Sequence, residues 1–231
     1  MKVLLVCASA PELPSFCRST GPASGKAKEF AGHQLYPLVC GVGPAMAAFS
    51  CGRELALNRY DLVIHTGIAG SIREEVKPGE AVAVTRDQFY LLGSEDHDRF
   101  LSVFELGLTD ANTEPYSQGK IDADPTCLSL LPQSVKQVEG ITVQCVHGRQ
   151  ESIQRLKKAY PEATTESQEG ASVMLAVRLS GLPCIQLRGI SNRVEPRNRE
   201  AWQIEPALNA VNQILIDFLN RIPLKAHERH C

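Results

Sequence analysis

The 231-residue sequence lacks the features that define several large classes of protein. It has no apolar run near the roughly 20 residues that a membrane-spanning helix needs. Its first apolar run, residues 2–7, is too short and too soon followed by polar residues and proline to be a signal peptide. The formal net charge is only −2, which provides no basic footprint for nucleic acid. We therefore expect a cytoplasmic protein with no membrane or nucleic-acid partner.

Motifs for metals and cofactors are also missing. None of the eight cysteines forms a C-x-x-C pair, and no histidine and cysteine cluster has the spacing of metal ligands. The segment Gly41–Gly43 lacks the third glycine of a dinucleotide fingerprint, and there is no P-loop or nucleophile elbow. We expect no metal, no cofactor and reduced cysteines. Four cysteines in or beside apolar runs are expected to be buried: Cys7, Cys40, Cys145 and Cys184.

The composition is that of a globular protein, with 43% hydrophobic and 22% charged residues. Apolar runs typical of buried strands alternate with segments of helical periodicity. This pattern predicts a three-layer α/β/α fold with a central mixed sheet in a single domain over residues 1–223, and a mobile tail at 224–231. The expected strands cover residues 3–7, 33–40, 61–66, 76–84, 141–146 and 183–187. The expected helices begin near Pro11 and cover 44–58, 125–131, 151–159, 165–179 and 200–221.

Several residues suited to chemistry follow these strands. Glu12, Glu169 and Asn192 lie at predicted strand-to-helix junctions, as do the segments Gly67–Ser71 and 147–149. Ligands in open α/β sheets bind at the carboxyl ends of the strands, so we expect these residues to share one edge.

The segment 188–202 is expected to be a loop after the strand at 183–187. It is rich in hydrogen-bond donors, and Pro196 and Trp202 are expected to fix its shape. A connection of this length is longer than the usual two to six residues, which favours a functional role.

Each of these features also has a purely structural explanation. A carboxylate at a predicted helix start is favoured by the helix dipole alone. The segment Gly67–Ser71 suits an ordinary turn, and 188–202 suits a basic surface loop. Glu166 precedes Glu169 by three positions, so the two would share a face if both were helical. His65, inside a strand, is expected to be a core residue.

Residues 85–120 are the least regular part of the sequence. A long irregular insert in a compact domain is usually functional or disordered. Its aromatic content argues against disorder, so we expect a binding loop or a subunit contact. The aromatic residues are Phe89, Tyr90, Phe100, Phe104 and Tyr116.

Five segments, in order, resemble the purine nucleoside phosphorylase and nucleosidase superfamily and together span nearly the whole chain. They are the first strand ending in Glu12, Gly41–Gly43 before a helix, Thr66–Ser71, Ser167–Ala171 and Arg188–Asn192. Within the superfamily the chain is similar to the futalosine hydrolase family, through Ser94–Asp96, Phe104–Leu108 and Ser191–Trp202. The resemblance implies a hydrolase of small-molecule nucleosides that assembles as a homodimer or a higher homo-oligomer.

The resemblance also implies roles for individual residues. The carboxylate matching Glu12 positions and deprotonates the attacking water, and the one matching Glu169 accepts hydrogen bonds from the ribose hydroxyls. The transition state resembles an oxocarbenium ion, so charge must be stabilised on the sugar and removed from the leaving base. The segment 147–149 matches a base-binding segment only across a gap. The remaining residues that the resemblance assigns to substrate binding are Ile68, Ala69, Gly70, Gln168, Gly170 and Ser191.

Asn192 departs from the pattern of the adenosine-type nucleosidases, which carry aspartate at the matching position. A protonated carboxyl can donate to N7 of the purine, whereas an amide cannot deliver a proton. An amide can present NH₂ to a 6-oxo group and C=O to a protonated N7. This chemistry fits hypoxanthine or guanine and leaves adenine badly paired.

The expected reaction is therefore hydrolysis of futalosine to hypoxanthine and dehypoxanthine futalosine, a step towards menaquinone. The alternatives are a methylthioadenosine/S-adenosylhomocysteine nucleosidase, a purine nucleoside phosphorylase, or a nucleoside-binding module without catalysis. The carboxylate at Glu12 would repel phosphate, which favours hydrolysis over phosphorolysis.

Two groups of arginines remain candidates for binding anions. Arg73, Arg86 and Arg149 are the candidates for holding phosphate in a phosphorylase. The benzoate group of futalosine invites a cation and an aromatic wall. Arg193, Arg197, Arg199 and the insert at 85–120 are the available sources for it.

Overall fold

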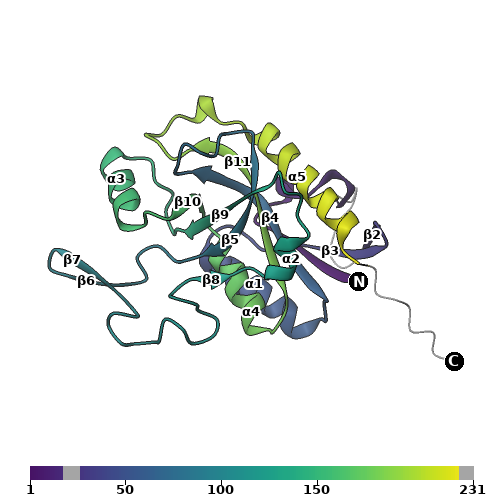
Figure 1. Cartoon of the computed structure of the whole chain (residues 1–231), viewed down its shortest axis with the longest axis horizontal. Coiled ribbons are helices and arrows are strands. Elements are labelled where there is room, and N and C mark those ends of the chain that lie inside the picture. The colour runs from purple at the N-terminus through teal and green to yellow at the C-terminus, as the bar shows by residue number, and fades with distance from the viewer. Residues whose placement is uncertain (18–26, 224–231) are drawn as a thin grey trace.

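In the computed structural model of the protein, a nine-stranded mixed sheet forms the centre of the described residues, 1–17 and 27–223 (Figure 1). The expected tail at 224–231 lies outside the described residues. The strands of this sheet are β1 (Lys2–Cys7), β2 (Lys28–Phe30), β3 (His33–Val39), β4 (Leu62–Ser71), β5 (Ala81–Asp87), β8 (Ile121–Asp122), β9 (Lys136–Thr142), β10 (Ala163–Ser167) and β11 (Cys184–Arg193). The helices are α1 (Pro44–Leu57), α2 (Pro125–Ser129), α3 (Gln150–Ala159), α4 (Gly170–Leu179) and α5 (Ile204–Arg221), and the 3-10 turns are η1 (Ala10–Glu12), η2 (Ser15–Cys17) and η3 (Arg199–Ala201).

The strands follow the order β10–β9–β5–β11–β4–β1–β3–β2, and β8 pairs with β5. β4 is the central strand: it is parallel to β1 and β11 and antiparallel to β10 at its last residues. β10 pairs with both β9 and β4, so this part of the sheet closes into a ring. The ring consists of β4, β11, β5, β9 and β10. The carboxyl end of β4 therefore lies between β11, whose last residue pairs with Ser71, and the antiparallel β10.

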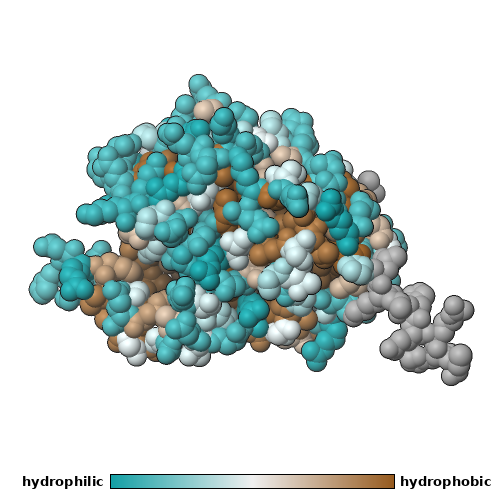
Figure 2. All heavy atoms as spheres, in the orientation of Figure 1, coloured by the Kyte–Doolittle hydropathy of each residue, from teal (hydrophilic) through white to brown (hydrophobic). Residues whose placement is uncertain are grey.

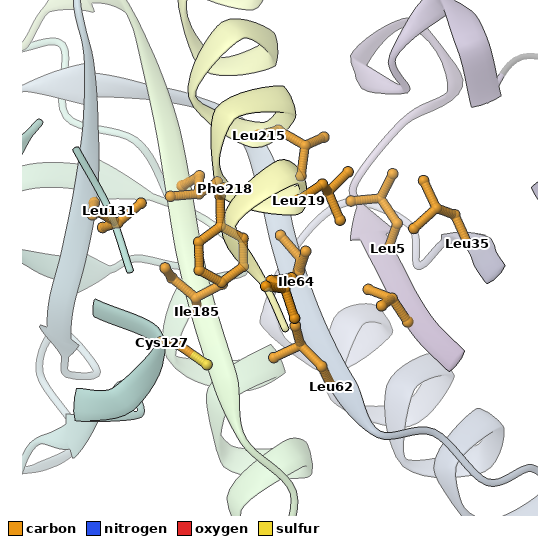
Figure 3. Packing of buried hydrophobic residues seen from close by; sticks show 14 of the residues in the cluster. Leu5, Leu35, Leu62, Ile64, Cys127, Leu131, Ile185, Leu215, Phe218 and Leu219 are labelled. Carbon is orange, nitrogen blue, oxygen red and sulfur yellow. The ribbon is translucent and has the colours of Figure 1, made fainter. Parts of the chain in front are cut away.

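Helices cover both faces of the sheet, with α5 on one side and α1 and α4 on the other (Figure 1). Alternation along β1 serves both layers, because Val3 and Leu5 pack in the α5 core while Leu4 and Val6 pack in the α1–α4 core. Figure 3 shows the α5 side, where Phe218 lies among side chains from β4, β11 and α2. The predicted three-layer arrangement around a mixed sheet is confirmed.

The insert at 85–120 is largely irregular, as expected, and carries a hairpin of β6 (Gly93–Asp96) and β7 (Arg99–Ser102). The hairpin projects from the body of the protein as an arm (Figure 1). Figure 2 shows that the tip of the arm is hydrophilic and that hydrophobic atoms gather where the arm meets the body. None of the helices in residues 1–17 and 27–223 has the length and apolar character that crossing a membrane requires.

Two segments expected to be loops are strands instead. Gly67–Ser71 is the second half of β4, and Arg188–Asn192 belongs to β11. The two halves pair with each other, with Gly189 opposite Ile68. Polar residues and glycines are tolerated here because the neighbouring strands satisfy the backbone groups. The carboxyl-edge residues therefore stand on rigid strands.

The segment Thr165–Glu169 is not the start of a helix. Its first three residues end β10, and α4 begins only at Gly170. Glu166 therefore shares no helix face with Glu169. It pairs with Gly70 of β4 instead, a long-range pairing that helical periodicity could not reveal.

Several smaller expectations also need correction. The strand expected at 141–146 lies at 136–142, and α5 begins at Ile204 rather than near residue 200. Only a 3-10 turn forms near Pro11. Cys145 is exposed rather than buried, because the strand that was expected to cover it ends at Thr142.

The α5 core gives a direct test of the fold. Phe218 is fully buried, and truncating a buried phenylalanine costs about 3–5 kcal/mol through lost burial and the cavity left behind. We expect Phe218→Ala to lower the free energy of unfolding by that amount in urea titrations, whereas Leu179→Ala, at an exposed position on α4, changes it little. Equal effects of the two substitutions would contradict the packing described here.

Candidate active site

Glu12 is held in the turn that follows β1. It is 8% exposed, and its carboxylate accepts three hydrogen bonds from the protein. Oε2 accepts from the Ser9 backbone N–H at 2.9 Å and from Ser9 Oγ at 3.0 Å. Oε1 accepts from the Ile68 N–H of β4 at 3.1 Å. These bonds fix the carboxylate above the middle of β4.

Glu169, the second carboxylate, lies immediately before α4 and is 6% exposed. Its Oε1 accepts a hydrogen bond from the Gly43 N–H at 2.9 Å. Gly43 adopts a φ of 92°, a left-handed conformation that glycine adopts at low cost. Burial raises the pKa of Glu169, the Arg188 charge and the Gly43 hydrogen bond act against that shift, and the charge of Glu12 adds to it.

Arg188 is the largest fully buried side chain among the residues that the structure describes, at 1% exposure. Its Nη2 donates to His65 Nε2 at 3.0 Å. Burial, followed by the neighbouring guanidinium, holds the pKa of His65 well below its usual range, so the imidazole is neutral and can accept this bond. Among the described residues, Nε and Nη1 of Arg188 have no hydrogen-bond partner. The guanidinium thus brings a buried positive charge with free donors into the site.

The carboxylate of Glu12 and the guanidinium of Arg188 converge on Gly67. A Cβ atom at Gly67 would lie 2.8 Å from Arg188 Nη1 and 2.8 Å from Glu12 Oε1. Only glycine leaves room for both groups at this point of β4. One carboxylate and one guanidinium therefore flank the same small space, and Glu169 lies near enough to both for their charges to act on it.

Asn192 lies further along the same strand pair. A register shift between Ile190 and Asn192 makes Ser191 an extra residue in β11 and places Asn192 opposite Gly70; such bulges re-aim side chains. Asn192 Oδ1 accepts from Ser191 Oγ at 2.7 Å, and Nδ2 donates to the Arg193 carbonyl at 2.8 Å. One N–H and one lone pair of the amide remain available.

The distance between the two parts of the site follows from the strand itself. Gly67 marks the carboxylates and Gly70 marks Asn192, three residues apart on β4. At roughly 3.3 Å per residue, the two parts lie about 10 Å apart. A nucleoside has its sugar and the far edge of its base separated on this scale.

The other predicted binding residues have identifiable contacts. Ile68 supplies its N–H to Glu12, and Ala69 supplies its carbonyl to Ser191 Oγ at 3.3 Å. Gln168 donates to the Gln144 carbonyl at 3.0 Å. Their contacts with a substrate stay predictions.

Packing against Asp87 requires a glycine at position 170. A Cβ there would lie 2.1 Å from Asp87 Oδ2, so the glycine lets the start of α4 rest on this carboxylate. Asp87 is buried and accepts from Thr142 Oγ1 at 3.0 Å and from Gln186 Nε2 at 3.1 Å. Thr142 Oγ1 in turn accepts from the Ala171 N–H at 2.7 Å. This polar cluster beneath α4 fixes the helix start that carries Glu169.

A small cavity of about 60 Å³ adjoins Asn192, well below the roughly 300–1,000 Å³ of most ligand pockets. It is lined by Gly70, Val146, His147, Glu166, Asn192, Arg193, Glu195, Arg197, Asn198 and Trp202. Within the described ranges, no group of three or more His, Cys, Asp or Glu side chains is placed to hold a metal ion.

Comparison with known proteins gives the class of this site. The model of the phosphorylase superfamily matches residues 2–220, and the chain belongs to that superfamily. Among its relatives, a futalosine hydrolase from Streptomyces coelicolor is 34% identical over 180 residues, covering 75% of this chain and 74% of the relative. A futalosine hydrolase from Acidothermus cellulolyticus is 36% identical over 174 residues, covering 74% and 69%. The resemblance noted in the sequence is thus confirmed.

Solved structures agree with the fold. A 5′-methylthioadenosine/S-adenosylhomocysteine nucleosidase from Streptococcus pneumoniae superposes with a TM-score of 0.79 at 20% identity, covering 96% of this chain and all of that one. Futalosine hydrolase of Helicobacter pylori superposes with a TM-score of 0.75 at 17% identity, covering 96% and 98%. At these identities the likeness concerns the fold alone.

The sequence predicted that Glu12, Glu169 and Asn192 lie at one edge of the sheet. It predicted no functional role for Arg188, for His65 or for Asp87 and its hydrogen-bond partners. One signal for Arg188 was available. It follows the apolar run 183–187 without a turn residue, and a charge that continues a buried strand must be paired or functional. The polar contacts of Asp87 come from β9 and β11, and the start of α4 packs on it, so no local pattern could show them.

Asp87 predicts a measurable pH dependence. Burial raises the pKa of its carboxyl from 3.8 to about 6. The folded protein binds this proton more tightly than the unfolded chain, so the contribution to stability is present at low pH and is lost as the pH rises through 6. Between about pH 4 and pH 7 we expect wild-type protein to lose about 2 kcal/mol more stability than Asp87→Asn.

Urea unfolding of both proteins at a series of pH values measures this difference. Asp122→Asn is the matched control, because Asp122 is partly exposed and pairs with Arg86 at 2.8 Å. Parallel stability curves for wild type and Asp87→Asn would contradict the assignment.

Proposed function

We propose that this protein hydrolyses futalosine to hypoxanthine and dehypoxanthine futalosine. The observation that carries the proposal is the division of the site. Two buried carboxylates and a buried arginine stand at one end, and an amide stands at the other. The similarity to two futalosine hydrolases, each at least 34% identical, supports the same substrate.

The carboxylate of Glu12 is the general base. It is fixed by Ser9 and Ile68 and shares the space at Gly67 with the Arg188 guanidinium. A water bound there would donate one proton to Glu12 and accept a hydrogen bond from Arg188 Nη1. The water attacks the anomeric carbon as the N-glycosidic bond breaks, and its oxygen becomes the sugar hydroxyl. The base departs with the bonding electrons and takes up a proton from solvent at N7, and Glu12 later returns its proton to solvent.

Glu169 stabilises the sugar. Its Oε1 is held by Gly43, which leaves Oε2 to accept from ribose hydroxyls. Its negative charge, in a buried position, is worth most when positive charge develops on the ring in the transition state. The raised pKa of Glu169 shows that this charge is costly without a partner.

Asn192 recognises the leaving base. Its amide is anchored by Ser191 and Arg193 and presents a remaining N–H and a remaining lone pair. A 6-oxopurine offers an acceptor at O6 and, once protonated, a donor at N7, which matches the amide. Adenine offers a donor at its 6-amino group, which matches less well, so the amide favours hypoxanthine.

Phosphorolysis is disfavoured because the three arginines considered for binding phosphate have other partners or lie elsewhere on the protein. Arg73 is occupied by backbone carbonyls, including that of Pro161 at 2.8 Å. Arg86 pairs with Asp122, and Arg149 is exposed at the start of α3. None of the three lies beside Gly67, so water is the nucleophile that the site suits.

The arginines considered for the benzoate group stand at the base end. Arg193 and Arg197 line the cavity beside Asn192, and Arg197 and Arg199 lie over the Trp202 ring, each 5.9 Å from its centre. With the base at Asn192 and the ribose at Glu169, the 5′ side of the ribose is expected on the far side of Glu169 from Asn192, where Gly43 and the start of α1 lie. This placement favours benzoate binding near α1.

We also propose a homodimer formed through α1. Three large apolar side chains at its start are exposed: Val42 at 62%, Met46 at 53% and Phe49 at 65%. Met46 and Phe49 lie three positions apart and so share a helix face. They adjoin Gly43, whose N–H holds Glu169, so a partner subunit there would close the ribose end. All cysteines in the described part are free, which fits a cytoplasmic protein.

The reaction is tested by base release. Purified protein incubated with futalosine should release hypoxanthine without added phosphate, at a rate at least tenfold above that with methylthioadenosine; liquid chromatography measures both. Phosphate-dependent release would indicate a phosphorylase instead. Absence of release from any nucleoside would contradict catalysis altogether.

The two carboxylates give separate predictions. Glu12→Gln removes the general base and should lower kcat by about 10²–10⁴-fold. Glu169→Gln keeps an acceptor for Gly43 but removes the charge, and should lower kcat about 10²-fold or more. Steady-state kinetics with futalosine measure both, and near-normal turnover in either variant would refute its assigned role.

The dimer is tested by introducing charge into the exposed α1 face. Phe49→Glu should convert a dimer into a monomer and raise KM for futalosine, because the ribose end loses its cover. Light scattering coupled to size-exclusion chromatography measures the mass. Leu179→Glu, an equally exposed leucine on α4, is the control and should stay dimeric. A monomeric wild-type protein would refute the proposal.

A further inference from the structure

The base end of the site has a second polar flank. Gly70 on β4 pairs with Asn192 on β11 at one side and with Glu166 on β10 at the other. Strands in a sheet lie about 4.8 Å apart, so the two flanks are separated by about 10 Å. A Cβ atom at Gly70 would lie 2.9 Å from Val194 Cγ2 and 3.3 Å from Asn192 Nδ2, so only glycine fits between the two flanks. The cavity above it is lined by Asn192 and by the pair His147 and Glu166.

The His147 side chain is clamped in place. Glu166 Oε1 accepts from the His147 backbone N–H at 3.0 Å, and Glu166 Oε2 contacts His147 Nδ1. The Tyr90 ring packs edge-on against the imidazole, 4.8 Å between centres. The side chains of His147 and Glu166 are both almost completely buried. The ring therefore has one orientation relative to the cavity.

The contact with Glu166 also fixes the tautomer. An ionised carboxylate only accepts hydrogen bonds, so Nδ1 of His147 must carry a proton. In the neutral imidazole, Nε2 is then an acceptor. Glu166 thus determines that His147 presents a lone pair.

6-Oxopurines and adenine differ at N1, the ring nitrogen bonded to C6. A 6-oxopurine carries a hydrogen on N1, whereas adenine has a lone pair on N1. Asn192 faces the O6 and N7 side of the base, so a group across Gly70 from Asn192 meets the side that carries N1. An acceptor there pairs with hypoxanthine and repels adenine.

We propose that His147 is a second base-recognition residue, and that its Nε2 accepts the N1–H of a 6-oxopurine. The proposal rests on the proposed function, because it takes the base to lie over Gly70 against Asn192. It assigns Glu166 the role of a positioning residue that sets the polarity of His147. Together the two flanks select hypoxanthine by hydrogen-bond direction at three atoms of the base.

Glu166→Gln tests this polarity directly. The backbone N–H of His147 requires an acceptor, so the amide oxygen takes the place of Oε1 and the NH₂ group faces Nδ1. The imidazole must then carry its proton on Nε2, which becomes a donor. We expect the preference for hypoxanthine over adenine, measured as the ratio of dissociation constants by calorimetry, to fall at least tenfold.

Two further variants, His147→Ala and Glu195→Gln, are measured in the same way. His147→Ala should weaken hypoxanthine binding about tenfold and should leave adenine binding equal or tighter, because the repulsive lone pair is removed. Glu195→Gln changes a carboxylate that lines the same cavity and should leave the ratio unchanged. An unchanged ratio in both Glu166→Gln and His147→Ala would overturn the proposal.

A ligand without N1–H provides a test that needs no folded variant. Wild-type protein should bind 1-methylhypoxanthine at least tenfold more weakly than hypoxanthine, and equal binding would overturn the proposal. Binding of free bases does not require hydrolysis. A protein that hydrolyses futalosine but fails these tests would refute the role of His147 alone and leave the proposed function intact.

Discussion

The buried charge of Arg188 is the constraint on which the rest of the site depends. Removing a guanidinium from water costs several kcal/mol unless opposite charges and acceptors surround it. Here the acids Glu12, Glu169 and Asp87 and the neutral His65 occur around the same strands. The arginine lowers the pKa of Glu169 and Asp87 against the effect of burial. Neither the buried carboxylates nor the buried guanidinium would be stable in this interior alone.

Charge can be concentrated in this way because the site is built on strands. Glu12 and Glu169 come from short connections, but Glu12 is held by the backbone of β4, and Glu169 is held by Gly43 at the start of α1 and immediately precedes α4. Three glycines give the polar groups room: Gly67 beneath Glu12 and Arg188, Gly70 beneath the base end and Gly170 above Asp87. Residues on strands move less than residues on loops, so these charges stay oriented before a substrate arrives.

The sequence could predict the parts of this arrangement that have local signals. The apolar runs of β1 and β11 and the helical patterns of α1 and α5 depend on neighbouring residues, so their places were predicted to within a few positions. The polar halves of β4 and β11 were wrongly predicted as loops. Their strand character comes from pairing with each other across more than 100 residues of sequence, and a polar strand between two partners looks like a loop in isolation.

Selectivity for the base requires a different physical means from catalysis at the sugar. At the ribose end, charge develops in the transition state, and formal charges at Glu12, Glu169 and Arg188 respond to it. At the base end, hypoxanthine and adenine are both neutral and nearly equal in shape, so charge and volume cannot separate them. Only the direction of hydrogen bonds differs. An anchored amide at Asn192 provides such direction, because its two free positions are fixed by Ser191 and Arg193. A carboxyl there would change polarity with its protonation state, whereas the amide keeps the same polarity at every pH at which the protein is folded.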